Sequence, residues 1–117
     1  MNIDIATSEK QSWNQVEGFM QKRFGKKPDL QSIIFLVGHR ELGKNISTFT
    51  KEQKQDVIHI GVCKLLSLRN YYHFISLDKD GWPHYEYNRL LPKLNAEAQE
   101  ELLKECILEY FITEKII

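Results

Sequence analysis

The segment from Thr50 to Asn70 constrains the fold of this chain more than any other part of it. Thr50 is a good helix N-cap, and Gln53 three residues later completes a capping box, so we expect a helix over residues 51–68. Its apolar residues fill one half of the helical wheel, and Ile60 and Cys63 extend them onto the other half. A helix that is apolar on both sides is typical of a buried position. We therefore predict a central helix with the other elements packed around it.

The length of the chain indicates one domain, residues 1–117, because 117 residues are enough to bury an apolar core. The 16 basic and 16 acidic residues cancel, which argues against a broad nucleic-acid surface. No apolar run approaches the ~20 residues of a membrane span, and the first residues lack the pattern of a signal peptide. The two cysteines, Cys63 and Cys106, fall on predicted helices, where buried free thiols are expected. We therefore expect a cytoplasmic protein with no membrane partner.

Three further helices are predicted from apolar residues at helical spacing. The first covers about residues 9–24, with Ser8 and Gln11 as a possible capping box. The second covers residues 29–42, although its apolar run Ile33–Val37 also fits a buried strand. Gly38 within it lowers helix propensity, and we expect it to let another helix approach closely. The last covers about residues 96–112.

A β-hairpin is predicted after the central helix, with strands over residues 71–77 and 82–88. The D-K-D-G sequence between them fits a type I turn followed by a left-handed glycine. This turn predicts that Ile75 opposes Tyr85 and that Ser76 opposes His84. The face expected to lie on the helices carries Tyr71, His73, Ile75, Leu77, Pro83, Tyr85 and Tyr87, and the outer face carries Tyr72, Phe74, Ser76, Trp82, His84 and Glu86. The chain is therefore predicted to be an α+β protein with about four helices and one hairpin.

Two segments, L-V-G-H-R-E-L-G and D-G-W-P-H-Y-E-Y-N-R-L-L-P, resemble a group of small bacterial proteins of about this length that are known only as hypothetical. The resemblance covers most of the chain. It implies no function and no site residues.

Metal chemistry has one candidate position in the sequence. His59 and Cys63 are four residues apart, so both point to the same side of the predicted central helix. A third ligand could come from His39, His73 or His84, as a zinc site needs three or four ligands. A partly buried histidine at a helix edge explains the pair more simply, and we predict neither a metal nor another cofactor.

Two short segments offer candidates for catalytic or calcium-binding chemistry. His39 could serve as a general base near Glu41, but neighbours on a helix diverge by about 100° and form no triad by themselves. Ser76, Asp78, Asp80 and Gly81 resemble the start of a calcium loop, but Tyr87 stands where the bidentate glutamate belongs. No phosphate-binding loop, dinucleotide fingerprint or hydrolase elbow is present. We predict no catalytic residues.

The leading functional hypothesis is a non-enzymatic interaction module that forms a homodimer and binds a protein partner of unknown identity. Its expected interface is the hairpin, through Phe74, Trp82, Tyr85 and Tyr87, because aromatic anchors are enriched at interfaces. Ile116 and Ile117 could add to this interface. The alternative is a small enzyme or metal-binding protein that uses His39, His59, Cys63 or His84.

Overall fold

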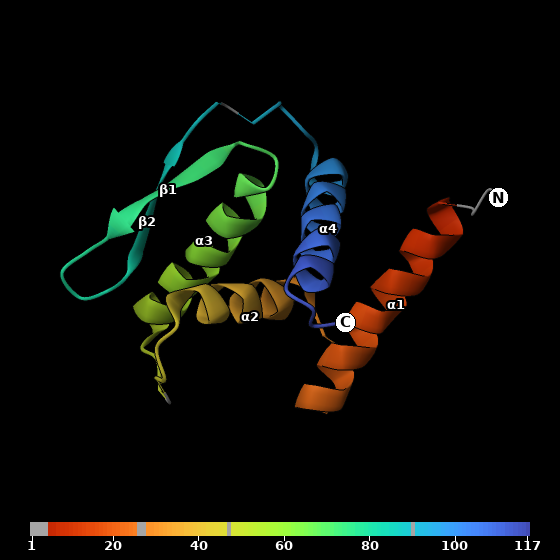
Figure 1. The fold of residues 1–117 in the computed structure, drawn as a ribbon, viewed down its shortest axis with the longest axis horizontal. Helices are drawn as coiled ribbons and strands as arrows, with labels where there is room; N and C mark the ends of the chain where they lie inside the picture. The colour runs from red at the N-terminus through yellow and green to blue at the C-terminus, as the bar shows by residue number, and fades with distance from the viewer. Residues whose placement is uncertain (1–4, 26–27, 47, 90) are drawn as a thin grey trace.

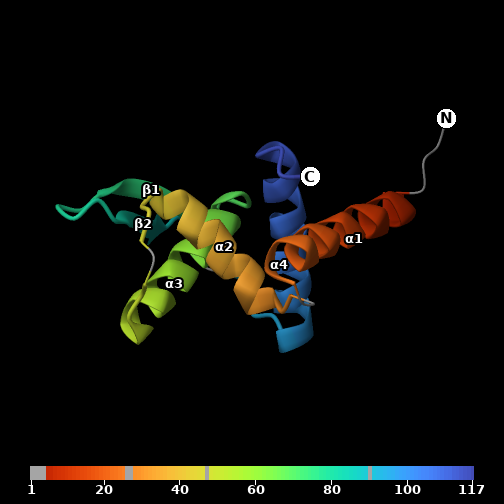
Figure 2. The same ribbon diagram turned by 90° about the horizontal axis from the view of Figure 1, so that it is seen from below.

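The computed structural model describes residues 5–25, 28–46, 48–89 and 91–117. In these residues the chain forms four helices and one antiparallel hairpin, which confirms the predicted α+β class. The hairpin and α1 lie at opposite ends of the molecule, with α3 and α4 between them (Figures 1 and 2). The elements in order are α1 (Ile5–Phe24), α2 (Leu30–Leu42), α3 (Lys51–Ser67), β1 (Tyr72–Leu77), β2 (Pro83–Tyr87) and α4 (Ala96–Thr113).

The first helix begins earlier than the sequence predicted. Because α1 already starts at Ile5, Ser8 lies inside the helix and is not its N-cap, so the expected capping box was wrong. The helix ends at Phe24 as predicted, and the next residue, Gly25, adopts the left-handed conformation (φ 75°) and donates its N–H to the Gln21 carbonyl at 2.7 Å. The helix therefore begins four residues before the predicted start at residue 9, and residues 1–4 lie outside the described residues.

The ambiguous segment over residues 29–42 is a helix, α2, with no strand in it. The Asp29 carboxylate accepts a hydrogen bond from the Ser32 backbone N–H at 2.7 Å, which caps its first turn. Gly43 ends the helix in the left-handed conformation (φ 67°). Local capping at both ends therefore favours the helix over the strand.

The central position of α3 is confirmed, because this helix contacts α2, α4, β1 and β2. Its predicted capping box is also present: the Gln53 N–H donates to Thr50 Oγ1 at 3.1 Å, and the Thr50 N–H donates to Gln53 Oε1 at 2.9 Å. Ile60 and Cys63 are buried on one side of the helix, and Leu65 is buried on the opposite side. This is expected for a helix that is covered on two sides. By share of residues, however, α2 is more buried, with six of 13 residues against six of 17 in α3.

The hairpin register differs from the prediction in one half of β1. The turn is as expected: the Gly81 N–H donates to the Asp78 carbonyl at 2.9 Å and Gly81 is left-handed (φ 83°). Ser76 opposes His84 as predicted, but a bulge at Ile75 places Phe74, not Ile75, opposite Tyr85. A bulge inserts one unpaired residue and so shifts every pair beyond it by one position. The predicted face was therefore wrong for the first half of β1, where Tyr72 pairs with Tyr87.

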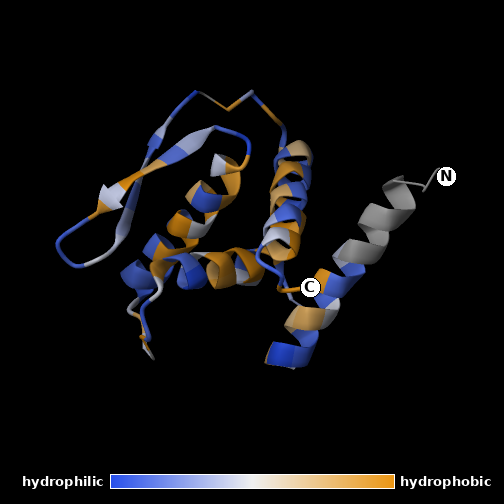
Figure 3. Cartoon of the chain, viewed as in Figure 1, coloured by the Kyte–Doolittle hydropathy of each residue, from blue (hydrophilic) through white to orange (hydrophobic). Residues whose placement is uncertain are grey.

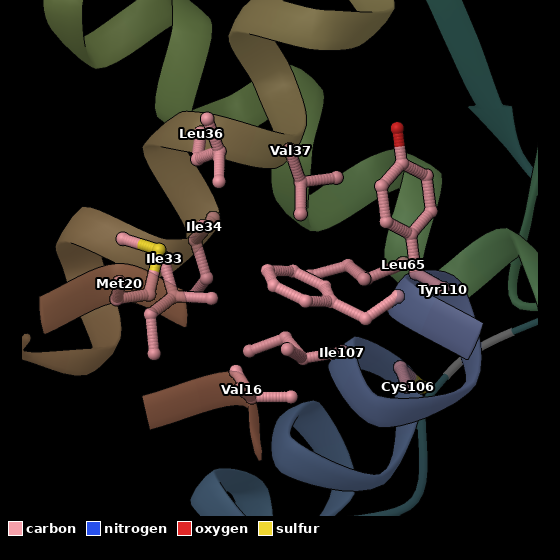
Figure 4. Packing of buried hydrophobic residues seen from close by; sticks show 11 residues of the cluster. Val16, Met20, Ile33, Ile34, Leu36, Val37, Leu65, Cys106, Ile107 and Tyr110 are labelled. Atoms are coloured by element: carbon pink, nitrogen blue, oxygen red, sulfur yellow. The ribbon is translucent and has the colours of Figure 1, made fainter. Parts of the chain in front are cut away.

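The main core lies where α1, α2 and α4 meet the end of α3 (Figures 3 and 4). From α1 it receives Val16 and Met20, and from α4 it receives the aromatic rings of Tyr110 and Phe111. The ring of Phe19 meets that of Phe111 edge-to-face at 5.8 Å between centroids. None of the helices in the described residues is both long enough and apolar enough to cross a membrane. The buried members are Val16, Met20, Ile33, Ile34, Leu36, Val37, Leu65, Cys106, Ile107, Tyr110 and Phe111.

Candidate functional site

A hollow of about 550 Å³ lies between α3 and the hairpin, and it is the best candidate for a functional site in the described residues. Its volume is in the range of small-molecule and peptide-side-chain sites. One wall comes from α3 and the other from the hairpin turn and β2, two segments that Figure 1 shows side by side. The residues that line this hollow are Gln53, Asp56, His59, Ile60, Cys63, Asp78, Asp80, Trp82, Pro83, His84 and Tyr85.

Helical spacing explains the α3 wall. Positions three and four apart lie on one face of a helix, and the lining residues from Gln53 to Cys63 follow this spacing. The hairpin wall follows from the register, because Pro83 and Tyr85 are two residues apart on β2 and point to the same face. Pro83 is buried and Tyr85 is half-buried, so this face of β2 is the one that lies on α3.

Asp78 organises the turn at the edge of the hollow. Its carboxylate accepts hydrogen bonds from the backbone N–H groups of Asp80 and Trp82, at 2.9 and 3.0 Å. Its other oxygen lies 2.9 Å from His84 Nε2. The hydrogen bond to His84, followed by the backbone donors, lowers the pKa of Asp78 from 3.8 to about 2. Asp78 is therefore a charged anchor that holds both the turn and the His84 ring in place.

Cys63 and His59 meet on the α3 wall, with Cys63 Sγ 3.5 Å from His59 Nε2. Burial raises the pKa of the Cys63 thiol to about 11, and only 1% of the residue is exposed. The thiolate is the nucleophilic form of cysteine, so a thiol with this pKa is inert at neutral pH. Cys63 is therefore buried at the base of the hollow, whereas His59 beside it is exposed at the rim.

The four predicted interface residues divide into two groups. Trp82 and Tyr85 line the hollow and are half-buried, and burial raises the pKa of Tyr85 to about 12. Phe74 and Tyr87 remain exposed, at 52% and 60%. The sequence did not indicate this division, because it depends on how the hairpin packs against α3.

The histidines proposed for the alternative function are only partly brought together. His59 and His84 line the same hollow, as does Cys63. His39 lies elsewhere, with its ring centroid 6.2 Å from that of Phe35 and 5.7 Å from that of Phe49. His73 also lies outside the hollow, and its Nδ1 atom is buried with no hydrogen-bond partner among the described residues. Searched over the same residues, no group of three or more His, Cys, Asp or Glu side chains could hold a metal ion.

Sequence reasoning missed a polar cluster where α2, α3 and α4 meet. Tyr110 Oη donates a hydrogen bond to Glu41 Oε2 at 2.7 Å, and Lys64 Nζ lies 3.7 Å from Glu41 Oε1. Burial and the Glu41 hydrogen bond both raise the pKa of Tyr110, so its hydroxyl stays protonated and donates. The sequence contained one signal for this cluster, because Tyr110 lies within the apolar stripe of the last helix. A tyrosine hydroxyl that is buried requires a hydrogen-bond partner. Glu41 therefore joins three helices and is not placed to orient His39.

No family model matches the chain, and no curated protein or solved structure matches it either.

Proposed function

We propose that this chain is a non-enzymatic interaction module that forms a homodimer through its hairpin. The supporting observation is the concentration of exposed apolar side chains on two short strands. Among the described residues, seven large hydrophobic side chains are exposed, and four of them lie on the hairpin. Figure 3 shows the apolar end of β1 at the part of the hairpin that extends past α3. These four residues are Phe74, Ile75, Leu77 and Tyr87.

The edge of β1 supports pairing with a second copy. In the described residues the sheet has two strands only, so each strand has one edge without a partner strand. Natural edge strands are protected by charges or prolines. The strand Tyr72–Leu77 contains neither a charged residue nor a proline. Two antiparallel copies of such an edge are complementary about a two-fold axis, which makes a second copy the fitting occupant.

The dimer surface that we propose is smaller than the one expected from sequence. Trp82 and Tyr85 belong to the hollow, and Ile116 and Ile117 pack against the helical core. Substitution of Trp82 would therefore alter the hollow and would be a poor test of the dimer. We place the module in the cytoplasm, because both cysteines are free thiols and a reducing compartment preserves that state.

Sedimentation velocity at micromolar concentration tests the dimer. We expect the wild type to sediment as a dimer and Phe74→Ala to sediment as a monomer with unchanged helical circular dichroism. Phe24→Ala is the matched control, because Phe24 on α1 is the same residue type and is also 52% exposed. It should remain dimeric. A monomeric wild type, or equal effects of the two substitutions, would refute the proposal.

A second candidate is a small enzyme that acts in the hollow. The observation in its favour is the 2.9 Å contact between Asp78 and His84, which orients an imidazole beside a lined cavity that also contains His59. A histidine oriented by a carboxylate is a common general base. A panel of simple carboxylic and phosphate esters tests this candidate. Turnover by the wild type that is lost in His84→Ala would support it, and absence of turnover would leave the dimer proposal unaffected.

A further inference from the structure

The hollow carries a local excess of negative charge, although the formal charge of the whole chain is zero. Three aspartates line it, Asp56, Asp78 and Asp80, and no Lys or Arg is among its described lining residues. Asp78 already has a hydrogen-bond partner in His84. The carboxylates of Asp56 and Asp80 have no ion-pair or hydrogen-bond partner within the described residues. Two exposed carboxylates at the rim therefore lack a counter-ion.

Neither Lys44 nor Lys79, the lysines at the turn, forms an ion pair with these carboxylates in the described residues. Lys44 Nζ lies 3.0 Å from the position that a β-carbon on Gly81 would occupy, so it reaches the turn. It forms no ion pair with a described carboxylate and does not line the hollow. The charge at the rim is therefore available to a cation from another molecule.

Aromatic side chains make the same hollow suitable for an organic cation. Elsewhere in the chain, basic side chains lie over aromatic rings, as Arg89 does over Tyr71 at 4.3 Å and Lys104 over Trp13 at 5.7 Å. No Lys or Arg of the described residues lies over Trp82 or Tyr85. Cations are attracted to the faces of aromatic rings, most strongly to tryptophan. Carboxylates at the rim and aromatic walls below them favour an ammonium or guanidinium group.

The shape of the hollow indicates whether that cation belongs to a small molecule or to a peptide segment. The α3 wall runs from Gln53 to Cys63, which are ten positions apart and so about 15 Å apart along a helix axis. An extended peptide of about four or five residues has the same length. Asp56, His59, Asp80 and His84 are exposed, so the hollow is open along its rim, whereas Ile60 and Pro83 are buried and form an apolar base. An open groove of this length suits a chain segment better than it suits an enclosed small molecule.

From this combination we infer that the hollow binds a short, extended segment of another protein that carries at least one Arg or Lys side chain. The basic group lies between Asp56 and Asp80 against Trp82, and the rest of the segment follows α3. This inference goes beyond the proposed dimer and is independent of it, because Phe74, Ile75, Leu77 and Tyr87 do not line the hollow.

Titration of ¹⁵N-labelled protein with acetyl-Ala-Arg-Ala-Arg-Ala-amide tests the inference, with the indole N–H of Trp82 as reporter. We expect the Trp82 and His59 signals to shift, and binding to weaken as salt is raised because exposed charges are screened. The acidic counterpart, acetyl-Ala-Glu-Ala-Glu-Ala-amide, should cause no shift. Absence of shifts with the basic peptide, or equal binding of the acidic one, would overturn the inference. Equally tight binding of free arginine amide would overturn the peptide part of it.

A charge-removal variant gives the second readout. Asp56→Asn with Asp80→Asn should raise the Kd about tenfold, as expected for two exposed ion pairs. The fold should be retained, because neither carboxylate has a described partner. Glu52→Gln is the control: it removes one negative charge from α3 at an exposed position outside the hollow, and binding should change little. Equal losses in the double variant and in the control would overturn the inference. Sedimentation of the same samples reports the dimer separately.

Discussion

Gly38 of α2 and Gly61 of α3 face each other at the point where the two helices cross, and neither position has space for a β-carbon. A β-carbon on Gly38 would stand 1.9 Å from the carbonyl oxygen of Val57. One on Gly61 would stand 2.3 Å from the carbonyl oxygen of Ile34. Because the atoms met are backbone atoms, the helices would have to move apart to accept any side chain. The close approach that Gly38 suggested in the sequence is thereby confirmed.

Gly38→Ala should destabilise the protein by about 3 kcal/mol, the upper part of the range for overpacked cores, even though alanine is the better helix former. Chemical denaturation measures this loss. Gly18→Ala is the matched control, because Gly18 is also helical but has nothing within 4 Å of the added carbon. That variant should gain about 0.5–1 kcal/mol from propensity alone. Two variants of equal stability would mean that α2 and α3 are farther apart in solution.

Leu65 should be among the most costly positions to truncate. It is fully buried on α3 and belongs to the core cluster with Ile107 and Phe111. Leu65→Ala removes buried methyl groups and leaves a cavity, so we expect a loss of about 2–5 kcal/mol in the free energy of unfolding. Leu91→Ala is a suitable comparison, because Leu91 is exposed. A loss below about 1 kcal/mol for Leu65→Ala would show that the site collapses or that α3 is packed differently.

Both cysteines should resist thiol reagents in the native protein. Burial raises the pKa of Cys63 and of Cys106 to about 11, so the reactive thiolate is scarce at pH 8. Labelling with a disulfide reagent should be slow in buffer and complete within minutes of adding denaturant. The single variants Cys63→Ala and Cys106→Ala assign each rate. Fast native labelling of Cys63 alone would reveal that the hollow opens around it.

The Asp78 carboxyl should titrate well below its ordinary range. Its folded pKa of about 2 lies below 3.8, so the folded state binds this proton more weakly than the unfolded chain does. The stabilising contribution is therefore complete above about pH 4 and is lost as the pH falls through about 2. A carbon-detected NMR titration measures the midpoint. His84→Ala should raise it, because the hydrogen bond to His84 is the largest cause of the shift. A wild-type midpoint near 4 would contradict the geometry of the turn.

The fold was more predictable from sequence than the candidate site was. Thr50 with Gln53, and Gly81 with its left-handed backbone, were placed correctly because each acts on residues at most four positions away. Ser8 was misassigned because an N-cap residue can equally well lie inside a helix. The hollow could not be assembled in advance, since its two walls are more than ten residues apart in the chain.

By itself, the sequence determined the four helices, the hairpin turn and the presence of a glycine at the α2–α3 crossing, because these depend on local capping, periodicity and backbone sterics. Only the tertiary structure decided that Ile75 bulges out of β1, and with it which aromatic residues point toward α3. The same packing placed Trp82 and Tyr85 in the hollow and left Phe74 and Tyr87 exposed. A one-residue shift in a strand reverses its faces, and the contacts that select the register come from distant segments.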